Sequence, residues 1–142
     1  MDGLGRLAIS ILATLNEAGE DYGSALLNTC IRCTGASGEP ERIINAILGL
    51  MDQSFVEIAV PREKGTGALL PLSPVEAKQT VGRLRSSVDW DCTSRLWRWS
   101  SGEPRFYVLT TEEGHRKGTE LLRAFGAGIA DPQPGDDDGS RG

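Results

Sequence analysis

The chain has 142 residues and a formal net charge of −5, and 39% of its residues are hydrophobic while 25% are charged. This length accommodates one domain with a hydrophobic core but not two, and the composition is that of an ordinary soluble protein. No apolar run approaches the roughly 20 residues that a membrane-spanning helix needs, so we expect no contact with a membrane. Because residues 1–6 lack the features of a secretory signal, we expect a cytoplasmic protein, and three cysteines, an odd number, do not suggest a disulfide framework.

Two amphipathic helices are predicted in the first part of the chain. Apolar residues recur with helical spacing from Leu4 to Leu15, and we expect Asp2 to be the N-cap and Gly19 to end the helix. A second helix is expected to begin after Asp21 and to end at residues 34–35.

A third helix and a strand are predicted next. Ser37 and Pro40 form a helix start, because proline suits the first turn, and the apolar spacing continues to Met51. Phe55–Val60 has the composition of a strand, which Pro61 closes.

The middle of the chain is expected to form a loop and then a further helix. Residues 62–72 show no periodic pattern and contain glycine and lysine, which is typical of a loop. The run Ser73-Pro74-Val75-Glu76 supplies an N-cap, a proline at the first helical position and an acid at the third, so a helix is predicted that ends near Asp89.

A β-hairpin and a final helix are predicted after this. Two aromatic and β-branched runs, Arg95–Ser100 and Arg105–Thr110, flank the turn sequence Ser-Gly-Glu-Pro at 101–104. Thr110 lies three residues before Glu113, which predicts a capping box that opens the last helix. Residues 126–142 are rich in Gly, Pro and Asp, so we expect a disordered acidic tail that is dispensable for folding.

Two segments resemble the winged helix-turn-helix superfamily of bacterial and archaeal transcription regulators. Ile43–Ile58 is similar to its recognition helix running into the first wing strand, and Tyr107-Val-Leu-Thr-Thr-Glu-Glu-Gly114 is similar to the phrase that ends the wing. The chain departs from the family in having Asp52-Gln53-Ser54 where a glycine is usual, an extra threonine in the second phrase, and an insertion at 61–94. The resemblance implies an α+β winged-helix domain over residues 1–125, with a three-helix core, a small antiparallel wing, an extra helix in the insertion and a C-terminal helix.

The resemblance also implies DNA binding, in which the third helix enters the major groove and the wing contacts the neighbouring backbone. On that helix, Arg42 would pair with guanine and Asn45 with adenine. The acids of the same helix, Glu39, Glu41 and Asp52, would face phosphates unfavourably. In the wing, three arginines alternate with aromatic residues and would contact phosphate or a narrow minor groove. These wing residues are Arg95, Arg98 and Arg105, beside Trp97, Trp99 and Phe106.

The charge distribution divides the chain into three parts. Residues 1–60 have three basic and eight acidic side chains, net −5, whereas residues 61–125 have eleven and eight, net +3, and residues 126–142 have one and four, net −3. A polyanion would be attracted to the middle part alone.

Each feature of the wing also has an explanation without nucleic acid. Trp97 and Trp99 would share one face of a strand, which favours core packing, and the arginines would be either solvated or in salt bridges with Glu57 or Glu103. The sequence therefore leaves two functions open. The first is a DNA-binding transcriptional regulator, and the second is a non-enzymatic winged-helix module that binds protein, with a homodimer among the possible assemblies.

Cysteine and histidine residues provide one further candidate site. Cys30 and Cys33 have the CxxC spacing of metal ligands, and Cys92 and His115 would complete a Cys₃His zinc site. Both CxxC cysteines also fall on the apolar face of the predicted second helix, so core packing explains them without a metal. With one histidine and no phosphate-binding loop, no catalytic constellation is visible, and we expect neither enzymatic activity nor a cofactor.

Overall fold

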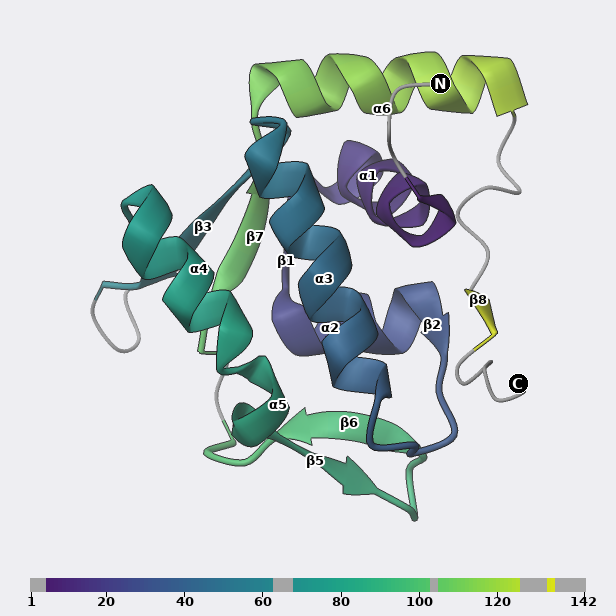
Figure 1. Ribbon diagram of the computed structural model, residues 1–142, viewed down its shortest axis with the longest axis vertical. Helices are drawn as coiled ribbons and strands as arrows, with labels where there is room; N and C mark the ends of the chain where they lie inside the picture. Colours follow the sequence, from purple (N-terminus) through teal and green to yellow (C-terminus); the bar gives the residue numbers. More distant parts are fainter. Residues whose placement is uncertain (1–4, 63–67, 103–104, 126–132, 135–142) are drawn as a thin grey trace.

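A computed structural model describes residues 5–62, 68–102, 105–125 and 133–134, and its fold is α+β with a small antiparallel sheet (Figure 1). The helices are α1 (Arg6–Ala18), α2 (Gly23–Cys30), α3 (Glu39–Asp52), α4 (Pro74–Gly82), α5 (Leu84–Ser87) and α6 (Glu112–Phe125). The strands are β1 (Glu20–Tyr22), β2 (Ile31–Arg32), β3 (Val56–Pro61), β4 (Leu69–Pro71), β5 (Val88–Asp91), β6 (Leu96–Trp99), β7 (Tyr107–Thr110) and β8 (Gln133–Pro134). None of the described helices combines the length and apolar character needed to cross a bilayer.

The hydrophobic core lies among α1, α2, α3 and the sheet. Most of the described apolar positions that predicted α1 and α3 are buried, for example Ile11, Leu15 and Ile47 at 0% exposure, whereas Leu7, Leu48 and Met51 are partly buried. Helix α6 crosses over α1 (Figure 1), and a glycine allows the close approach, because a Cβ on Gly118 would lie 3.2 Å from the carbonyl oxygen of Leu12. The predicted first, third and last helices are therefore present.

The main sheet has the strand order β1-β7-β3-β4, and all its pairings are antiparallel. Strand β7 lies between β1 and β3, with Val108 opposite Asp21 on one side and Ile58 on the other. The sequence predicted β3 but not β1 or β4, because each of these has three residues, too few for an alternating pattern. Residues 69–71, which were expected in a loop, thus form an edge strand.

The predicted hairpin between Arg95–Ser100 and Arg105–Thr110 is wrong. Strand β6 pairs with β5, which places Trp97 opposite Trp90, and β7 belongs to the main sheet instead. The edge of β6 that faces away from β5 is closed by a side chain, since the Asn28 amide donates to the carbonyl of Trp97 (2.9 Å) and accepts its N–H (2.9 Å). The predicted helix was expected to end near Asp89, so the sequence did not identify residues 88–91 as the strand that pairs with β6.

Helix boundaries differ from the prediction at three places. The second helix ends at Cys30, and Cys33 lies beyond it. The predicted helix over 73–89 is divided into α4 and α5 before β5, although its cap is confirmed, because Ser73 Oγ accepts the N–H of Glu76 (3.3 Å). Helix α6 is capped by Thr111 rather than Thr110, since Thr111 Oγ1 accepts the N–H of Gly114 (3.0 Å).

Two further expectations concern residues that are only partly described. The proposed N-cap Asp2 lies outside the described residues, as does most of the predicted disordered tail, residues 126–132 and 135–142. Within that tail, Gln133–Pro134 forms a two-residue parallel pairing with β2.

Candidate nucleic-acid interface

Helix α3 has one face in the core and an opposite face that points outward. Ile43, Ile47 and Leu50 are fully buried, while Asn45 is exposed and Arg42 is half-buried. This difference in exposure follows from the helical repeat, which places the polar residues of α3 on the side away from its apolar stripe. The two residues assigned to base recognition, Arg42 and Asn45, therefore belong to the outward half of the helix.

A groove of about 520 Å³ lies between this outward half of α3 and the beginning of α1. Arg42, Asn45 and Gly49 line it from α3, Gln53 from the C-cap of that helix, and Arg6 from α1. The charged side chains among the described lining residues are both arginines, so the groove has a basic lining although residues 1–60 are acidic overall. We call this groove, which these five residues line, the α1–α3 groove.

Two of the three acidic residues of α3 that were expected to face phosphate form ion pairs with residues of the insertion at 61–94. Glu41 forms an ion pair with Arg85 of α5, and Asp52 forms one with Lys78 of α4 at 3.3 Å. Helices α4 and α5 pack along α3 on the side of these acids (Figure 1). The insertion thereby offsets the charges that were expected to oppose a polyanion.

The third acid of α3, Glu39, is fully buried and holds three segments together. Its Oε2 accepts the backbone N–H (2.8 Å) and the hydroxyl (3.1 Å) of Thr34, and its Oε1 accepts the N–H of Gly35 (3.0 Å) and the indole N–H of Trp97 (3.0 Å). The expectation that Glu39 faces phosphate is therefore wrong. Its location in the first turn of α3 was visible in the sequence, but its four donors come from residues that only the fold assembles.

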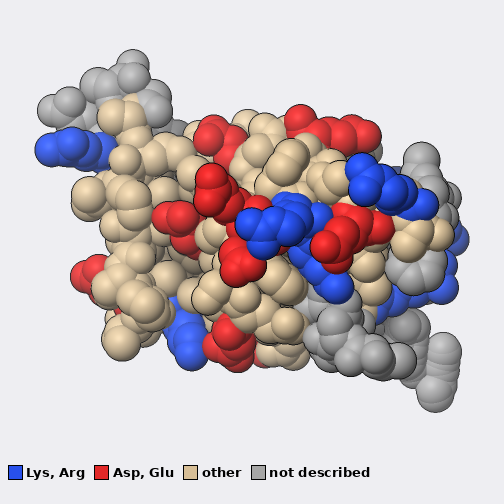
Figure 2. All heavy atoms as spheres, turned by 90° about the horizontal axis from the view of Figure 1, so that it is seen from above, with Lys and Arg blue, Asp and Glu red and all other residues tan. Residues whose placement is uncertain are grey.

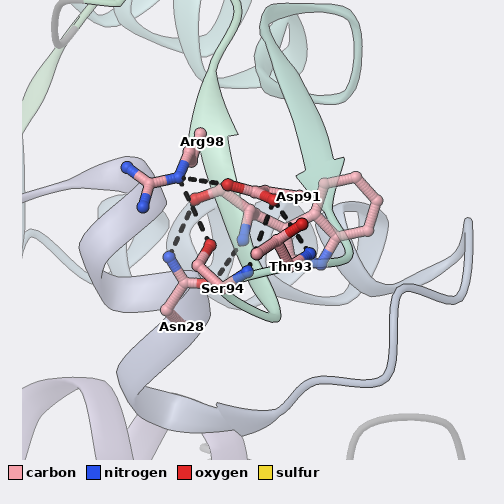
Figure 3. A network of polar contacts seen from close by, with 6 residues as sticks. Asn28, Asp91, Thr93, Ser94 and Arg98 are labelled. Carbon is pink, nitrogen blue, oxygen red and sulfur yellow. Dashed lines mark hydrogen bonds and ion pairs between the residues drawn. The ribbon is translucent and has the colours of Figure 1, made fainter.

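Arg98 extends outward from β6 and forms an ion pair with Asp91 (Figure 3). Its Nε donates to Asp91 Oδ2 (2.8 Å), while Asp91 Oδ1 accepts the N–H groups of Thr93 (3.0 Å) and Ser94 (3.4 Å). Hydrogen bonds from Ser94 and Thr93, together with that from Arg98, lower the pKa of Asp91 below its usual value. Asp91 thus closes the β5–β6 turn and orients the guanidinium of Arg98, which was expected to pair with Glu57 or Glu103.

The other two candidate arginines are also exposed but lie in different surroundings. Arg95, at the β5–β6 turn, has a φ of 59°, and its guanidinium carbon lies 6.0 Å from the centroid of the Trp90 ring. Arg105 precedes β7, outside that hairpin. The structure therefore places Arg95 and Arg98 on one hairpin and Arg105 on the approach to another sheet.

The two tryptophans of β6 pack inward. Trp97 and Trp99 are 7% and 9% exposed, and Trp99 makes an edge-to-face contact with Phe106, with 5.7 Å between the ring centroids. The core-packing interpretation of both residues is confirmed, and in this arrangement they offer no stacking surface to a nucleic acid base.

The four metal candidates are not brought together. Cys30 Sγ faces Thr14 Oγ1 (3.6 Å), Cys33 Sγ faces the carbonyl of Leu27 (3.5 Å), Cys92 is exposed at the β5–β6 turn, and His115 is exposed on α6. Burial raises the pKa of Cys30, and burial together with the charge of Glu39 raises that of Cys33 to about 12, so both thiols are protonated at neutral pH. In the described part of the chain, no three His, Cys, Asp or Glu residues are grouped as metal ligands.

The face seen from above α6 carries basic and acidic side chains intermixed (Figure 2). On α6, Arg116 pairs with Glu113 (3.1 Å) and Lys117 with Glu120 (4.0 Å). Such a surface has no extended field of one sign to attract a polyanion. The α1–α3 groove is therefore the better candidate for an interface with nucleic acid.

Comparisons of the chain with protein-family models, curated proteins and solved structures found no significant match.

Proposed function

We propose that the protein is a winged-helix DNA-binding regulator that places the outward half of α3 in the major groove. The arrangement supports this proposal in two respects. A short strand, β1, lies between α1 and α2, and the order β1-β7-β3 puts it beside two longer strands, as in a winged helix. Ser54, which occupies the place of the family's usual glycine, has a φ of 64°, the left-handed conformation that glycine favours.

The observation that carries the proposal is the basic lining of the α1–α3 groove beside acids that are already paired. Arg42 and Asn45 are suited to guanine and adenine edges, and Arg6 adds a second cation at the rim. Because Glu41 and Asp52 pair with the insertion and Glu39 is buried, the net −5 of residues 1–60 overstates the charge that DNA would meet. Arg95, Arg98 and Arg105 would add backbone contacts.

Fluorescence anisotropy with labelled duplex DNA over a salt series tests this function. We expect affinity to fall steeply with salt, and each lost phosphate contact to reduce the log–log slope by about 0.9. The double substitution Arg6→Ala with Arg42→Ala is expected to weaken binding more than Arg123→Ala, which removes one exposed charge from α6. The triple substitution Arg95→Ala, Arg98→Ala and Arg105→Ala is expected to weaken binding to all sequences alike.

A second candidate function is a protein-binding module without DNA affinity. Its specific support is the insertion, where Leu70 of β4 and Val75 of α4 are large apolar side chains with exposures of 47% and 67%. Absence of DNA binding even at low salt would contradict the first proposal and favour this one.

A further inference from the structure

A second groove, of about 360 Å³, lies between the first turn of α2 and strand β6, and none of its lining residues lines the α1–α3 groove. This volume falls within the range of roughly 300–1,000 Å³ typical of small-molecule sites. Its lining residues supply a cation, the beginning of a helix, exposed apolar side chains and a buried indole whose N–H has no acceptor among the described residues. We call it the α2–β6 groove.

The cation is Arg98, which lines this groove and is held in one orientation. Its Nε is occupied by Asp91 (2.8 Å) and lies 3.4 Å from Ser94 Oγ, while its two terminal nitrogens donate to no described residue. In Figure 3 these terminal nitrogens point away from Asp91. A guanidinium fixed through Nε presents its remaining N–H groups as a planar fork, which matches the two oxygens of a carboxylate or a phosphate.

The first turn of α2 adds a positive partial charge. No side chain caps this helix, its first turn contains no acidic residue, and Ser24 and Ala25 line the groove. Unpaired backbone N–H groups and the helix dipole favour an anion at such an end. The neighbouring acid Asp21 is not among the lining residues, and its Oδ1 accepts the N–H of Tyr22 (3.0 Å).

The walls of the groove are aromatic and aliphatic. Tyr22 and Leu96 are unusually exposed for their type, at 37% and 39%. Trp99 is nine-tenths buried in the wall, and its indole N–H is one of two buried side-chain polar atoms that lack a partner among the described residues. Buried donors are nearly always hydrogen-bonded, so a Trp99 N–H without an acceptor among the described residues is unusual in this wall.

We propose that the α2–β6 groove binds a small aromatic anion, with its carboxylate or phosphate on Arg98 and the first turn of α2 and its ring against Tyr22 and Leu96. This site is independent of DNA binding and goes beyond the function proposed above. The charge, the donors and the apolar walls each select one part of such a ligand. A neutral aromatic compound and a bare inorganic anion would each satisfy one part alone.

The test is a titration of the ¹⁵N-labelled full chain followed by NMR, with benzoate, phenyl phosphate, inorganic phosphate and benzyl alcohol as probes. We expect benzoate or phenyl phosphate to shift the indole N–H signals of Trp97 and Trp99 saturably. The aromatic anion that binds more tightly identifies the anionic group. Inorganic phosphate and benzyl alcohol are expected to bind at least about tenfold more weakly, because each lacks one half of the recognised chemistry.

Two variants and one control connect any binding to this groove. Arg98→Gln removes the fork, and Ala25→Asp places a negative charge in the first turn of α2, where it favours the helix but repels an anion. Each is expected to weaken binding about tenfold or more, while Arg123→Gln on α6 leaves it unchanged. The proposal is overturned if neither aromatic anion gives saturable shifts, if benzyl alcohol or inorganic phosphate binds equally well, or if both groove variants, folded as judged by their spectra, bind like the wild type.

Discussion

Replacing Glu39 with alanine removes a buried carboxylate that accepts four hydrogen bonds from three residues. The substitution leaves the backbone N–H groups of Thr34 and Gly35 and the indole N–H of Trp97 without an acceptor, while the Thr34 hydroxyl is able to rotate to another. An unsatisfied buried donor costs about 1–3 kcal/mol, and the cost for the buried Trp97 N–H adds to the smaller costs for Thr34 and Gly35, which solvent partly reaches. We therefore expect Glu39→Ala to lower the free energy of unfolding by about 3–5 kcal/mol.

A urea titration followed by circular dichroism measures this loss, with Glu41→Ala as the matched control. Glu41 lies two residues away on the same helix, but its ion pair with Arg85 is exposed, so its removal is expected to cost only about 0–1 kcal/mol. Glu39→Gln is expected to fall between the two, because the amide retains one oxygen and turns its NH₂ toward donors on the other side. Equal, small losses in Glu39→Ala and Glu41→Ala would show that the Glu39 contacts do not hold α3 in place.

A double-mutant cycle measures the coupling energy of the hydrogen bond between Glu39 and Trp97. Trp97→Phe removes the indole donor and keeps an aromatic ring in the core, so the combination with Glu39→Ala is expected to cost less than the two single losses together. A coupling of about 1 kcal/mol or more is expected for a hydrogen bond to a charged group, and strict additivity would contradict the contact.

Two further predictions concern packing and thiol reactivity. Gly114→Ala is expected to lower the free energy of unfolding by about 1–3 kcal/mol, since its Cβ would overlap the backbone of Phe55. Gly49→Ala, which has open space around the added Cβ, is expected to raise the free energy of unfolding by about 0.5–1 kcal/mol. Thermal unfolding of both variants checks these opposite signs. With Ellman's reagent at pH 8, the folded protein is expected to expose one reactive thiol, Cys92, because a pKa of about 12 keeps Cys33 protonated and Cys30 is fully buried. Reaction of all three cysteines before unfolding would contradict this.

Local signals in the sequence predicted most of the helices and the presence of strands β3, β6 and β7, although the helix expected over 73–89 is divided into α4 and α5. The apolar spacing of Ile43, Ile44, Ile47 and Leu50 defines the buried face of α3, and the same spacing leaves Arg42 and Asn45 in its outward half. Ser73 caps α4 through a residue three positions away, and β3 lies within one residue of its predicted bounds. Each of these features depends on neighbours within about one or two helical turns.

The strand order of the main sheet and the burial of Glu39 depend on contacts between segments that are far apart in the chain. Strand β6 pairs with the neighbouring strand β5, and its other edge is occupied by Asn28, 69 residues before Trp97, a contact on which no local pattern reports. Glu39 appeared as an ordinary first-turn acid, yet Trp97, 58 residues away, donates to it in the core. A strand of three or four residues has little pattern of its own, and a carboxylate is buried only where the fold delivers enough donors to replace water. The pairing partners and the burial of Glu39 are therefore properties of the assembled chain.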